Sequence, residues 1–156
     1  SDVYKRQMKI RNAIIDDAKE IFNIEKKVFK DHWSLKSIKS ELNNLKYSKI
    51  SVLEVERKII GYIFQRIIDD QNHIINVAID IPFQHKGYGR FLLKNILKDD
   101  SDDTNVFLEV KEANFPAIKL YNDLGFVEVQ KKDNYYSDGS SAIFMLKRNK
   151  RDGLVQ

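Results

Sequence analysis

A strand, a glycine-bearing turn and a helix follow one another directly in this chain, and that order constrains the fold more than any other feature. Residues 74–81 are rich in Ile and Val, which predicts a strand buried on both faces. The turn 84–90 carries Gly87 and Gly89. Apolar residues then recur with helical spacing, which predicts a helix over about residues 87–97. A helix that starts in a glycine turn after a buried strand is typical of a mixed α/β fold.

The start of this helix is suited to binding an anion. Its first N–H groups lack partners within the helix, and the helix dipole places partial positive charge there. Glycine lets a phosphate oxygen approach the main chain closely, and Lys86 and Arg90 add positive charge. The turn therefore predicts a site for a phosphate-bearing molecule, whose class must come from the rest of the chain.

Two known phosphate-binding motifs can be tested against this turn. The Walker loop requires G-x-x-x-x-G-K-[ST], a string that the sequence lacks. The dinucleotide fingerprint G-x-G-x-x-G can begin at Gly87 and Gly89, and Glu109 lies where a ribose-binding acid is expected. However, Leu92 replaces its third glycine, and 156 residues are too few for two mononucleotide-binding halves. The dinucleotide interpretation is therefore the weaker alternative.

The composition narrows the class of protein further. With 156 residues and neither a flexible linker nor a repeat, the sequence predicts one domain over residues 8–148, with disordered extensions at 1–7 and 149–156. The absence of cysteine excludes disulfides, thiolate zinc sites and a cysteine nucleophile. The three histidines show no ligand spacing, so no metal site is expected.

The charge is mildly positive and concentrated near the ends of the chain. Lys and Arg number 27 against 23 Asp and Glu, a net charge of +4, and much of the excess lies in residues 5–6 and 147–151. This distribution favours solvated ends over a specific nucleic-acid-binding face. Neither an apolar run of about 18 residues nor the apolar core of a signal peptide occurs, so we expect no membrane association and a cytoplasmic location.

The remaining segments predict alternating strands and helices. Further strands are expected at residues 8–13, 50–56, 59–68, 106–110, 126–130 and 142–146. Further helices are expected after the caps Asp16 or Asp17 and Ser34, and from Pro116 to the C-cap Gly125. The polar residues 56–58 predict a hairpin, and the turn 69–72 makes residues 74–81 its third antiparallel neighbour.

Four segments together carry a family pattern. Residues 76–80 form the strand before the turn, residues 84–89 read Q-x-x-G-x-G, residues 108–114 read L-E-V-K-E-A-N, and residues 120–126 read L-Y-N-D-L-G-F. In this order, and followed by Asn134-Tyr135-Tyr136, they resemble the GNAT acetyltransferases, most closely the bacterial ribosomal-protein-alanine N-acetyltransferases of the RimI type. The resemblance covers about residues 9–147, with Lys111 where the family has arginine.

The resemblance implies an α/β (α+β mixed-sheet) fold and a co-substrate. The sheet would be mostly antiparallel, splayed at its middle strands, with helices on both faces. Acetyl-CoA would bind with its pyrophosphate on the glycine turn and its pantetheine arm along the preceding strand, where a backbone N–H near Ala78 meets the thioester carbonyl. The implied cofactor-binding residues are Val77, Ala78, Ile79, His85, Lys86, Gly87, Tyr88, Gly89, Arg90 and Asn114.

Glu109 and Tyr121 match the general base and general acid of the family. An ordinary glutamate is a poor proton acceptor at neutral pH, so Glu109 is expected to act through a bound water or in a setting that makes it more basic. Tyr121 would protonate the departing CoA thiolate. Without the family pattern, Glu109 would be a strand-end surface charge and Tyr121 a residue packed on the sheet.

The loops that flank the acceptor in the family nominate Trp33, Tyr135 and Tyr136 as substrate-binding residues. Trp33 can instead be a hydrophobic staple before the Ser34 cap. The sequence also departs from the family here, because Asp31-His32-Trp33 replaces Phe-Pro-Trp and the loop after Tyr136 is shorter.

The implied activity is transfer of an acetyl group from acetyl-CoA to an amine by direct attack in a ternary complex. Near pH 7.4 about a fifth of an N-terminal α-amine is neutral, against about a thousandth of a lysine amine, so the α-amine is the easier acceptor. The leading hypothesis is therefore acetylation of a protein N-terminus, with a ribosomal protein as the leading partner. Acetylation of a lysine or small-molecule amine is the alternative within this chemistry. A non-catalytic acyl-CoA-binding or nucleic-acid-associated module is the alternative of another class.

Overall fold

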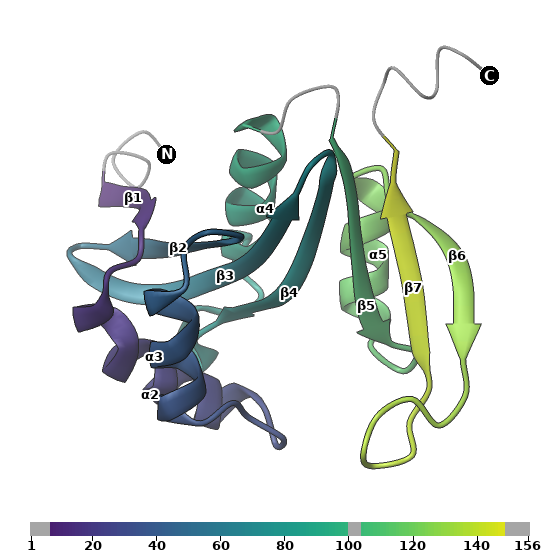
Figure 1. The fold of residues 1–156 in the computed structure, drawn as a ribbon, viewed down its shortest axis with the longest axis horizontal. Helices are drawn as coiled ribbons and strands as arrows, with labels where there is room; N and C mark the ends of the chain where they lie inside the picture. The colour runs from purple at the N-terminus through teal and green to yellow at the C-terminus, as the bar shows by residue number, and fades with distance from the viewer. Residues whose placement is uncertain (1–6, 100–103, 149–156) are drawn as a thin grey trace.

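A seven-stranded sheet runs through the structure (Figure 1). The computed structural model describes residues 7–99 and 104–148 of the chain. The described strands lie in the order β1-β2-β3-β4-β5-β7-β6; β4 and β5 pair in parallel, and the other neighbours are antiparallel. The strands are β1 (Met8–Asn12), β2 (Ser48–Val55), β3 (Lys58–Ile68), β4 (Gln71–Ile79), β5 (Asn105–Lys111), β6 (Val127–Lys132) and β7 (Ala142–Lys147).

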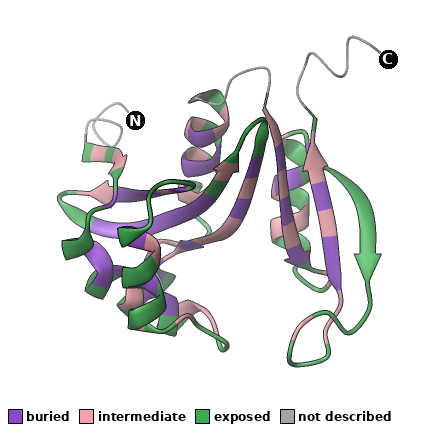
Figure 2. Ribbon diagram, viewed as in Figure 1, coloured by how far each residue is buried: buried purple, intermediate pink, exposed green. Residues whose placement is uncertain are grey.

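Helices cover both faces of this sheet. On one face α2 (Ala18–Val28) and α3 (Leu35–Asn43) pack around Tyr62 and Phe64. On the other face α4 (Tyr88–Asp99) and α5 (Phe115–Asp123) share a core with Leu108, which also includes residues of β7. Figure 2 shows the buried central strands and the edge strand β6, which is exposed along its length. The predicted fold, a mostly antiparallel sheet with helices on both faces, is confirmed.

Local signals in the sequence explain several boundaries. Ser34 caps α3 as predicted, because its Oγ accepts the backbone N–H of Ser37 at 3.0 Å. Glu56 and Arg57 both have positive φ angles, which gives the tight turn of the predicted β2–β3 hairpin. Gly125 has a φ of +98° directly after α5, the left-handed conformation expected of a glycine C-cap.

The prediction for β4 was wrong in two respects. The strand spans Gln71–Ile79 rather than residues 74–81, and Asp80 then caps a short 3-10 helix, η2 (Ile81–Phe83). Ile74 and Ala78 are buried, but Val77 and several neighbours are only half-buried. The physical reason is the pairing with β5, which covers only Gln71–Ile74 against Asn105–Leu108. Beyond these four pairs the strands diverge, so one flank of β4 is open (Figure 1).

A β-bulge adds to this divergence. Phe64 of β3 pairs with Asn76, and Gln65 pairs with Ile74, so Ile75 is an extra residue in β4. A bulge bends its strand and increases the local twist. Here it lies at the point where β4 leaves β5, which confirms the predicted splay of the middle strands.

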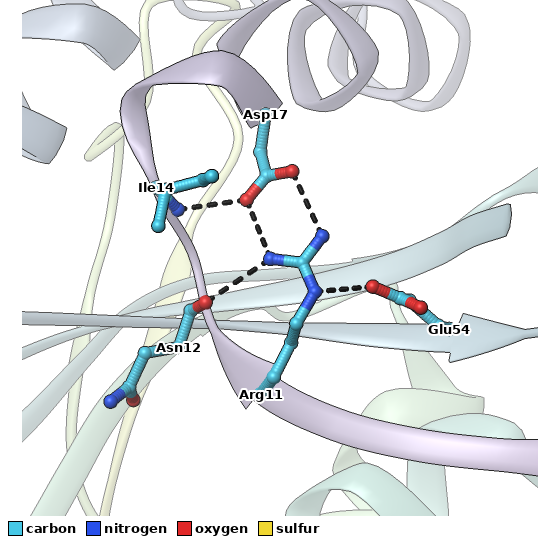
Figure 3. A network of polar contacts seen from close by, with 5 residues as sticks. All are labelled: Arg11, Asn12, Ile14, Asp17 and Glu54. Atoms are coloured by element: carbon cyan, nitrogen blue, oxygen red, sulfur yellow. Dashed lines mark hydrogen bonds and ion pairs between the residues drawn. The ribbon is translucent and has the colours of Figure 1, made fainter. Parts of the chain in front are cut away.

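At the β1 edge of the sheet, a polar network joins β1, β2 and the 3-10 helix η1 (Ile15–Asp17) (Figure 3). The Arg11 guanidinium binds the Asp17 carboxylate through two nitrogens, at 2.8 and 2.9 Å, and also contacts Glu54. Asp17 Oδ2 accepts the backbone N–H of Ile14 at 2.8 Å. The hydrogen bonds from Arg11 hold the pKa of Asp17 below its ordinary value of 3.8.

Some predictions concern segments outside the described residues. The expected disorder at residues 1–7 and 149–156 falls there, apart from Gln7, as does most of the acidic exit loop expected at 99–103. Within residues 7–99 and 104–148, every helix is too short or too polar to cross a membrane.

Candidate active site

A cleft of about 640 Å³ opens where β4 and β5 diverge. Its walls come from β4, β5, α5, the loop after α2 and the loop between β6 and β7. Five of the predicted site residues line it, namely Val77, Glu109, Asn114, Tyr121 and Tyr136. The structure therefore brings the predicted base and acid into one cavity, together with part of the predicted cofactor and substrate sites.

The Glu109 side chain extends from β5 toward His73, a histidine that was not among the predicted site residues. Its Oε2 lies 2.7 Å from His73 Nε2 of β4, and both side chains are partly exposed. The His73 ring stacks on Phe107, with centroids 4.3 Å apart. His73 pairs with Phe107 in the parallel register, and Phe107 and Glu109 share a face of β5, so the register brings the imidazole to the carboxylate.

Tyr121 lies on α5 with its ring nearly buried. Burial raises the pKa of Tyr121 to about 12, so the phenol keeps its proton at neutral pH. Burial also raises the pKa of Tyr136 to about 12, and the nearby charge of Glu109 contributes. The predicted base and these two phenols therefore line the same cleft, and both phenols keep their protons at neutral pH.

The predicted phosphate turn forms a second, smaller hollow of about 260 Å³. Gln84 lines both hollows, so the two adjoin. The lining of the second hollow includes six of the predicted cofactor-binding residues, namely Ile79, His85, Gly87, Tyr88, Gly89 and Arg90. The predicted turn and the predicted acid and base thus line two adjoining hollows.

The main chain of this turn fits a phosphate. Gly87 has a φ of +90°, which side-chain-bearing residues rarely adopt, and α4 begins at the next residue. A Cβ on Gly87 would meet no described atom within 4 Å, so the backbone there faces open space. Free N–H groups at the start of a helix, beside an open glycine, can donate hydrogen bonds to a pyrophosphate such as that of acetyl-CoA.

Several contacts hold the turn against the sheet. Gln84 Nε2 donates to the carbonyl of Ile79 at 2.9 Å, and Asp80 accepts from the backbone of Ile81 and from Lys27. Gly61 of β3 permits close packing here, because a Cβ on it would lie 2.6 Å from Ile79 Cδ1. The position of the turn is therefore set by β3, β4 and α2.

Other predicted cofactor residues have different surroundings. The Ala78 side chain is buried in the core under α2 rather than in the cleft. Lys86 is exposed and lines neither hollow, and Arg90 forms an ion pair with Asp123 at 3.0 Å. Asn114 lies at the cleft, but its Oδ1 accepts the N–H of Ala117 at 3.3 Å and caps α5.

Two predicted substrate-binding residues do not line the cleft. Trp33 packs edge-on against Phe64, with ring centroids 5.1 Å apart, as a residue that anchors the start of α3 does. The Tyr135 ring contacts the rings of Phe144 and Tyr136, and Tyr135 is not among the residues that line the cleft. The Trp33 ring thus packs against the core that α2, α3 and β3 share, and both of its predicted roles stay predictions.

The cleft also contains residues that the sequence did not nominate. Lys30 and Asp31 line it from the loop after α2, and Ser137 lines it from the β6–β7 loop. Ser137 Oγ donates to Asp31 Oδ2 at 2.7 Å, which joins the two loops at the cleft. Asp31 was noticed only as a departure from the family pattern, and no local sequence signal places it opposite a serine 106 positions away.

Comparisons with known proteins agree with this geometry. Residues 11–149 match the model of the acetyltransferase (GNAT) domain. The chain is 30% identical to an N-alpha-acetyltransferase of Sulfolobus acidocaldarius, over 90% of this chain and 92% of that protein. It is 30% identical to the ribosomal protein bS18-alanine N-acetyltransferase of Escherichia coli K12, over 83% and 89%. The crystal structure of the ribosomal-protein-S18-alanine N-acetyltransferase from Escherichia coli superposes with a TM-score of 0.85 at 27% identity, covering 91% of this chain and 94% of that one.

A splayed sheet, with a cleft that holds a carboxylate and two phenols beside an open glycine turn, is the geometry expected of a transferase that uses an acyl-CoA. The chain belongs to the acetyltransferase (GNAT) domain family. It is accordingly an acetyl-CoA-dependent N-acetyltransferase, as the names of its relatives also indicate.

Proposed function

We propose that the chain acetylates the α-amine of a protein N-terminus, with a ribosomal protein as the leading acceptor. The observation that carries this proposal is the lining of the cleft that holds Glu109, which includes two loops joined by the hydrogen bond from Ser137 to Asp31. Such an approach suits the free end of a chain. The names of the Sulfolobus and Escherichia coli relatives support an N-terminal acceptor and, for the latter, a ribosomal one.

The residues of the glycine turn would bind the co-substrate. The amides of residues 86–90 would hold the pyrophosphate, and the pantetheine arm would follow Val77 and Ile79. Alternate backbone groups of a strand point toward opposite neighbours, and beyond Ile74 the β5 side of β4 pairs with no strand of residues 7–99 and 104–148. Amides on that side are therefore available to the thioester carbonyl. Acetyl-CoA supplies the acetyl thioester and a thiolate leaving group.

Glu109 would receive the proton that the acceptor amine loses as the C–N bond forms. Its contact with His73, whose side chain is 29% exposed, offers that proton a route to solvent. Tyr121 would donate its proton to the sulfur as the C–S bond breaks and would recover one from solvent afterwards. Starting from the neutral amine, one amide forms, one thioester is cleaved and CoA leaves as its thiol. The proton passed to solvent through Glu109 offsets the one that Tyr121 recovers, so no net proton is released.

The decisive experiment is mass spectrometry of acetyl transfer onto a peptide panel. Peptides that begin with Ala or Ser should gain one acetyl group at the α-amine. The same peptides with a blocked N-terminus and a free lysine should react far more slowly, because less of their amine is neutral. Activity confined to the lysine peptides, or to a polyamine, would reject the proposal in favour of the alternative acceptors.

A further inference from the structure

A buried carboxylate on α2 lies behind the cleft without lining it. Glu25 is 2% exposed, and its side chain accepts three hydrogen bonds from three different segments. Its Oε1 accepts from the Tyr62 hydroxyl of β3 and from Asn76 Nδ2 of β4, the latter at 2.7 Å. Its Oε2 accepts the backbone N–H of Trp33 at 2.9 Å.

Packing alone does not account for this carboxylate. All three donors are neutral, and among the described residues neither lysine nor arginine forms an ion pair with Glu25. Removing a carboxylate from water is costly unless its oxygens are well hydrogen-bonded, and an apolar side chain would fill the space without that cost. Three converging donors indicate that the group connects the segments that carry them.

Those segments form one side of the cleft. Asn76 lines the cleft directly after the bulge in β4. Lys30 and Asp31 line it from the loop between α2 and α3, and that loop continues to Trp33. Because a single carboxylate binds both Asn76 and the Trp33 amide, it sets the distance between the loop and the strand. The hydrogen bonds of Glu25 do not reach the glycine turn at residues 84–90.

We propose that Glu25 is a positioning residue for the acceptor, because it fixes loop 29–34 against β4. The inference rests on the proposed function, in which this loop borders the acceptor. It predicts an asymmetry in the kinetics. Loosening the loop should weaken acceptor binding, while acetyl-CoA binding at the glycine turn should be unaffected.

The test is Glu25→Gln in the full chain. A glutamine has one acceptor oxygen and one donor nitrogen, so it cannot accept from Trp33 while it also accepts from Tyr62 and Asn76. The KM for the best acceptor peptide should rise about tenfold, and the KM for acetyl-CoA should stay within about twofold of wild type. An unchanged acceptor KM would overturn the proposal.

Asp17→Asn is the matched control. Asp17 is also a buried carboxylate that accepts a backbone N–H, that of Ile14, but it lies at the β1 edge and lines neither hollow. The control should lower the thermal midpoint and leave the acceptor KM unchanged. An equal rise of the acceptor KM in both variants would mean general destabilisation and would also overturn the proposal.

Hydrogen exchange at the Trp33 amide gives a readout that needs no acceptor. The protection of the Trp33 amide should fall in Glu25→Gln and stay unchanged in Asp17→Asn. Equal protection in wild type and in both variants would overturn the proposal. If wild type acetylates no peptide, the proposed function fails, while this measurement still tests whether Glu25 holds the loop.

If Glu25→Gln does not fold, Tyr62→Phe removes one donor and keeps the ring, and a smaller loss of Trp33 protection is expected. Full protection in that variant would overturn the proposal.

Discussion

At the scale of single residues, the pair formed by His73 and Glu109 carries the most chemistry. A carboxylate alone in the cleft would have to return its proton by the route through which the acceptor entered. The imidazole lies 2.7 Å from Glu109 Oε2 and is partly exposed, so in the proposed mechanism it would offer a separate route. The ring of Phe107 holds the imidazole in place by stacking.

Replacing Glu109 with glutamine should lower kcat about a hundredfold, because general-base catalysis typically contributes that much or more. Acetyl-CoA binding should persist, since the glycine turn is unchanged. Steady-state kinetics with an Ala-starting peptide, together with calorimetric titration of acetyl-CoA, would measure the two effects. Glu112→Gln is the control, because Glu112 follows β5 directly but pairs with Lys131 at the surface. An unchanged kcat in Glu109→Gln would show that the base lies elsewhere.

Replacing His73 with asparagine should lower kcat less, by about tenfold, because the base remains and only its proton route is lost. The melting temperature should change little, since the ring is partly exposed. Rate measurements at several concentrations of a small proton carrier such as imidazole would separate the loss of a proton route from a structural effect of the substitution. Partial rescue by imidazole supports proton transfer; a loss of rate that imidazole cannot alter contradicts it.

Glu109 and Tyr121 could be predicted from the sequence because each lies within a short motif with fixed neighbours. His73 could not, because its partner is 36 positions away and the contact depends on the parallel register of β4 and β5. Asp31 and Ser137 were missed for the same reason. The T-shaped contact of Trp33 with Phe64 of β3 could not be predicted either, because it joins segments 31 positions apart.

At the scale of elements, the turn before α4 combines an unusual backbone with open space. Gly87 and His85 both have positive φ angles, which few residues with side chains adopt. The strain of these positive φ angles is tolerated because hydrogen bonds of the Gln84 and Asp80 side chains hold the turn at the end of β4. The turn therefore presents its amides in a fixed arrangement before the co-substrate arrives.

Gly87→Ala should raise the KM for acetyl-CoA about tenfold, because the new methyl group would occupy the space that the phosphate approaches. Its positive φ should also cost about 1 kcal/mol of stability. Gly139→Ala is the matched control, since Gly139 has a φ of +86° in the β6–β7 loop and should show the same cost in stability alone. Kinetics and thermal melts of both variants test this, and equal acetyl-CoA KM values in both would contradict it.

The β1 edge provides a prediction about acid stability. The pKa of Asp17 is lowered in the folded chain, chiefly by the hydrogen bonds from Arg11, so the carboxylate stabilises the fold above its ordinary pKa of 3.8. As the pH falls below that value the unfolded chain takes up the proton first, and the stabilisation is lost once the folded carboxyl protonates. Urea unfolding at pH 7 and near pH 3 should show that Asp17→Asn costs about 2 kcal/mol at pH 7 and less at acid pH. A constant difference at both pH values would contradict this.

Element boundaries were predicted best where a local signal marks them. The start of α3, the turn of the β2–β3 hairpin and the end of α5 were predicted correctly. Their signals, Ser34, residues 56–57 and Gly125, act over only a few residues. The ends and burial of β4 were wrong because apolar composition does not reveal that a strand borders a cleft. Ile75 to Ile79 are apolar apart from Asn76, and yet one flank of this segment lacks a strand partner.

At the scale of the whole molecule, the site lies between two parts of the sheet. One part comprises β1 to β4, and the other comprises β5, β7 and β6. The turn and α2 belong to the first part, whereas Glu109 and Tyr121 come from the second part and its helix α5. The mostly antiparallel sheet and its splay followed from the family resemblance. The extent of the splay, set by the pairing of only Gln71–Ile74 with Asn105–Leu108, could not be predicted because it depends on contacts between distant segments.

Because acetyl-CoA would contact both parts, it should stabilise the entire fold. At a concentration about 100 times its Kd, it should add about 2.7 kcal/mol to the free energy of unfolding, which for a chain of this size raises the thermal midpoint by about 5–10 °C. Differential scanning fluorimetry with acetyl-CoA, and with inorganic phosphate as the control, measures this. A midpoint that does not move at millimolar acetyl-CoA would contradict the assigned co-substrate site.

The four-residue pairing of β4 with β5 also has a mechanical meaning. The neighbouring strands β2 and β3 are joined by eight pairs, so the sheet is least stiff where the reaction takes place. A co-substrate bound across β4 and β5 would resist bending of the sheet there, as additional strand pairs would. The co-substrate is then more than a reactant, because the rigidity needed to hold an amine at a thioester is complete only after it has arrived.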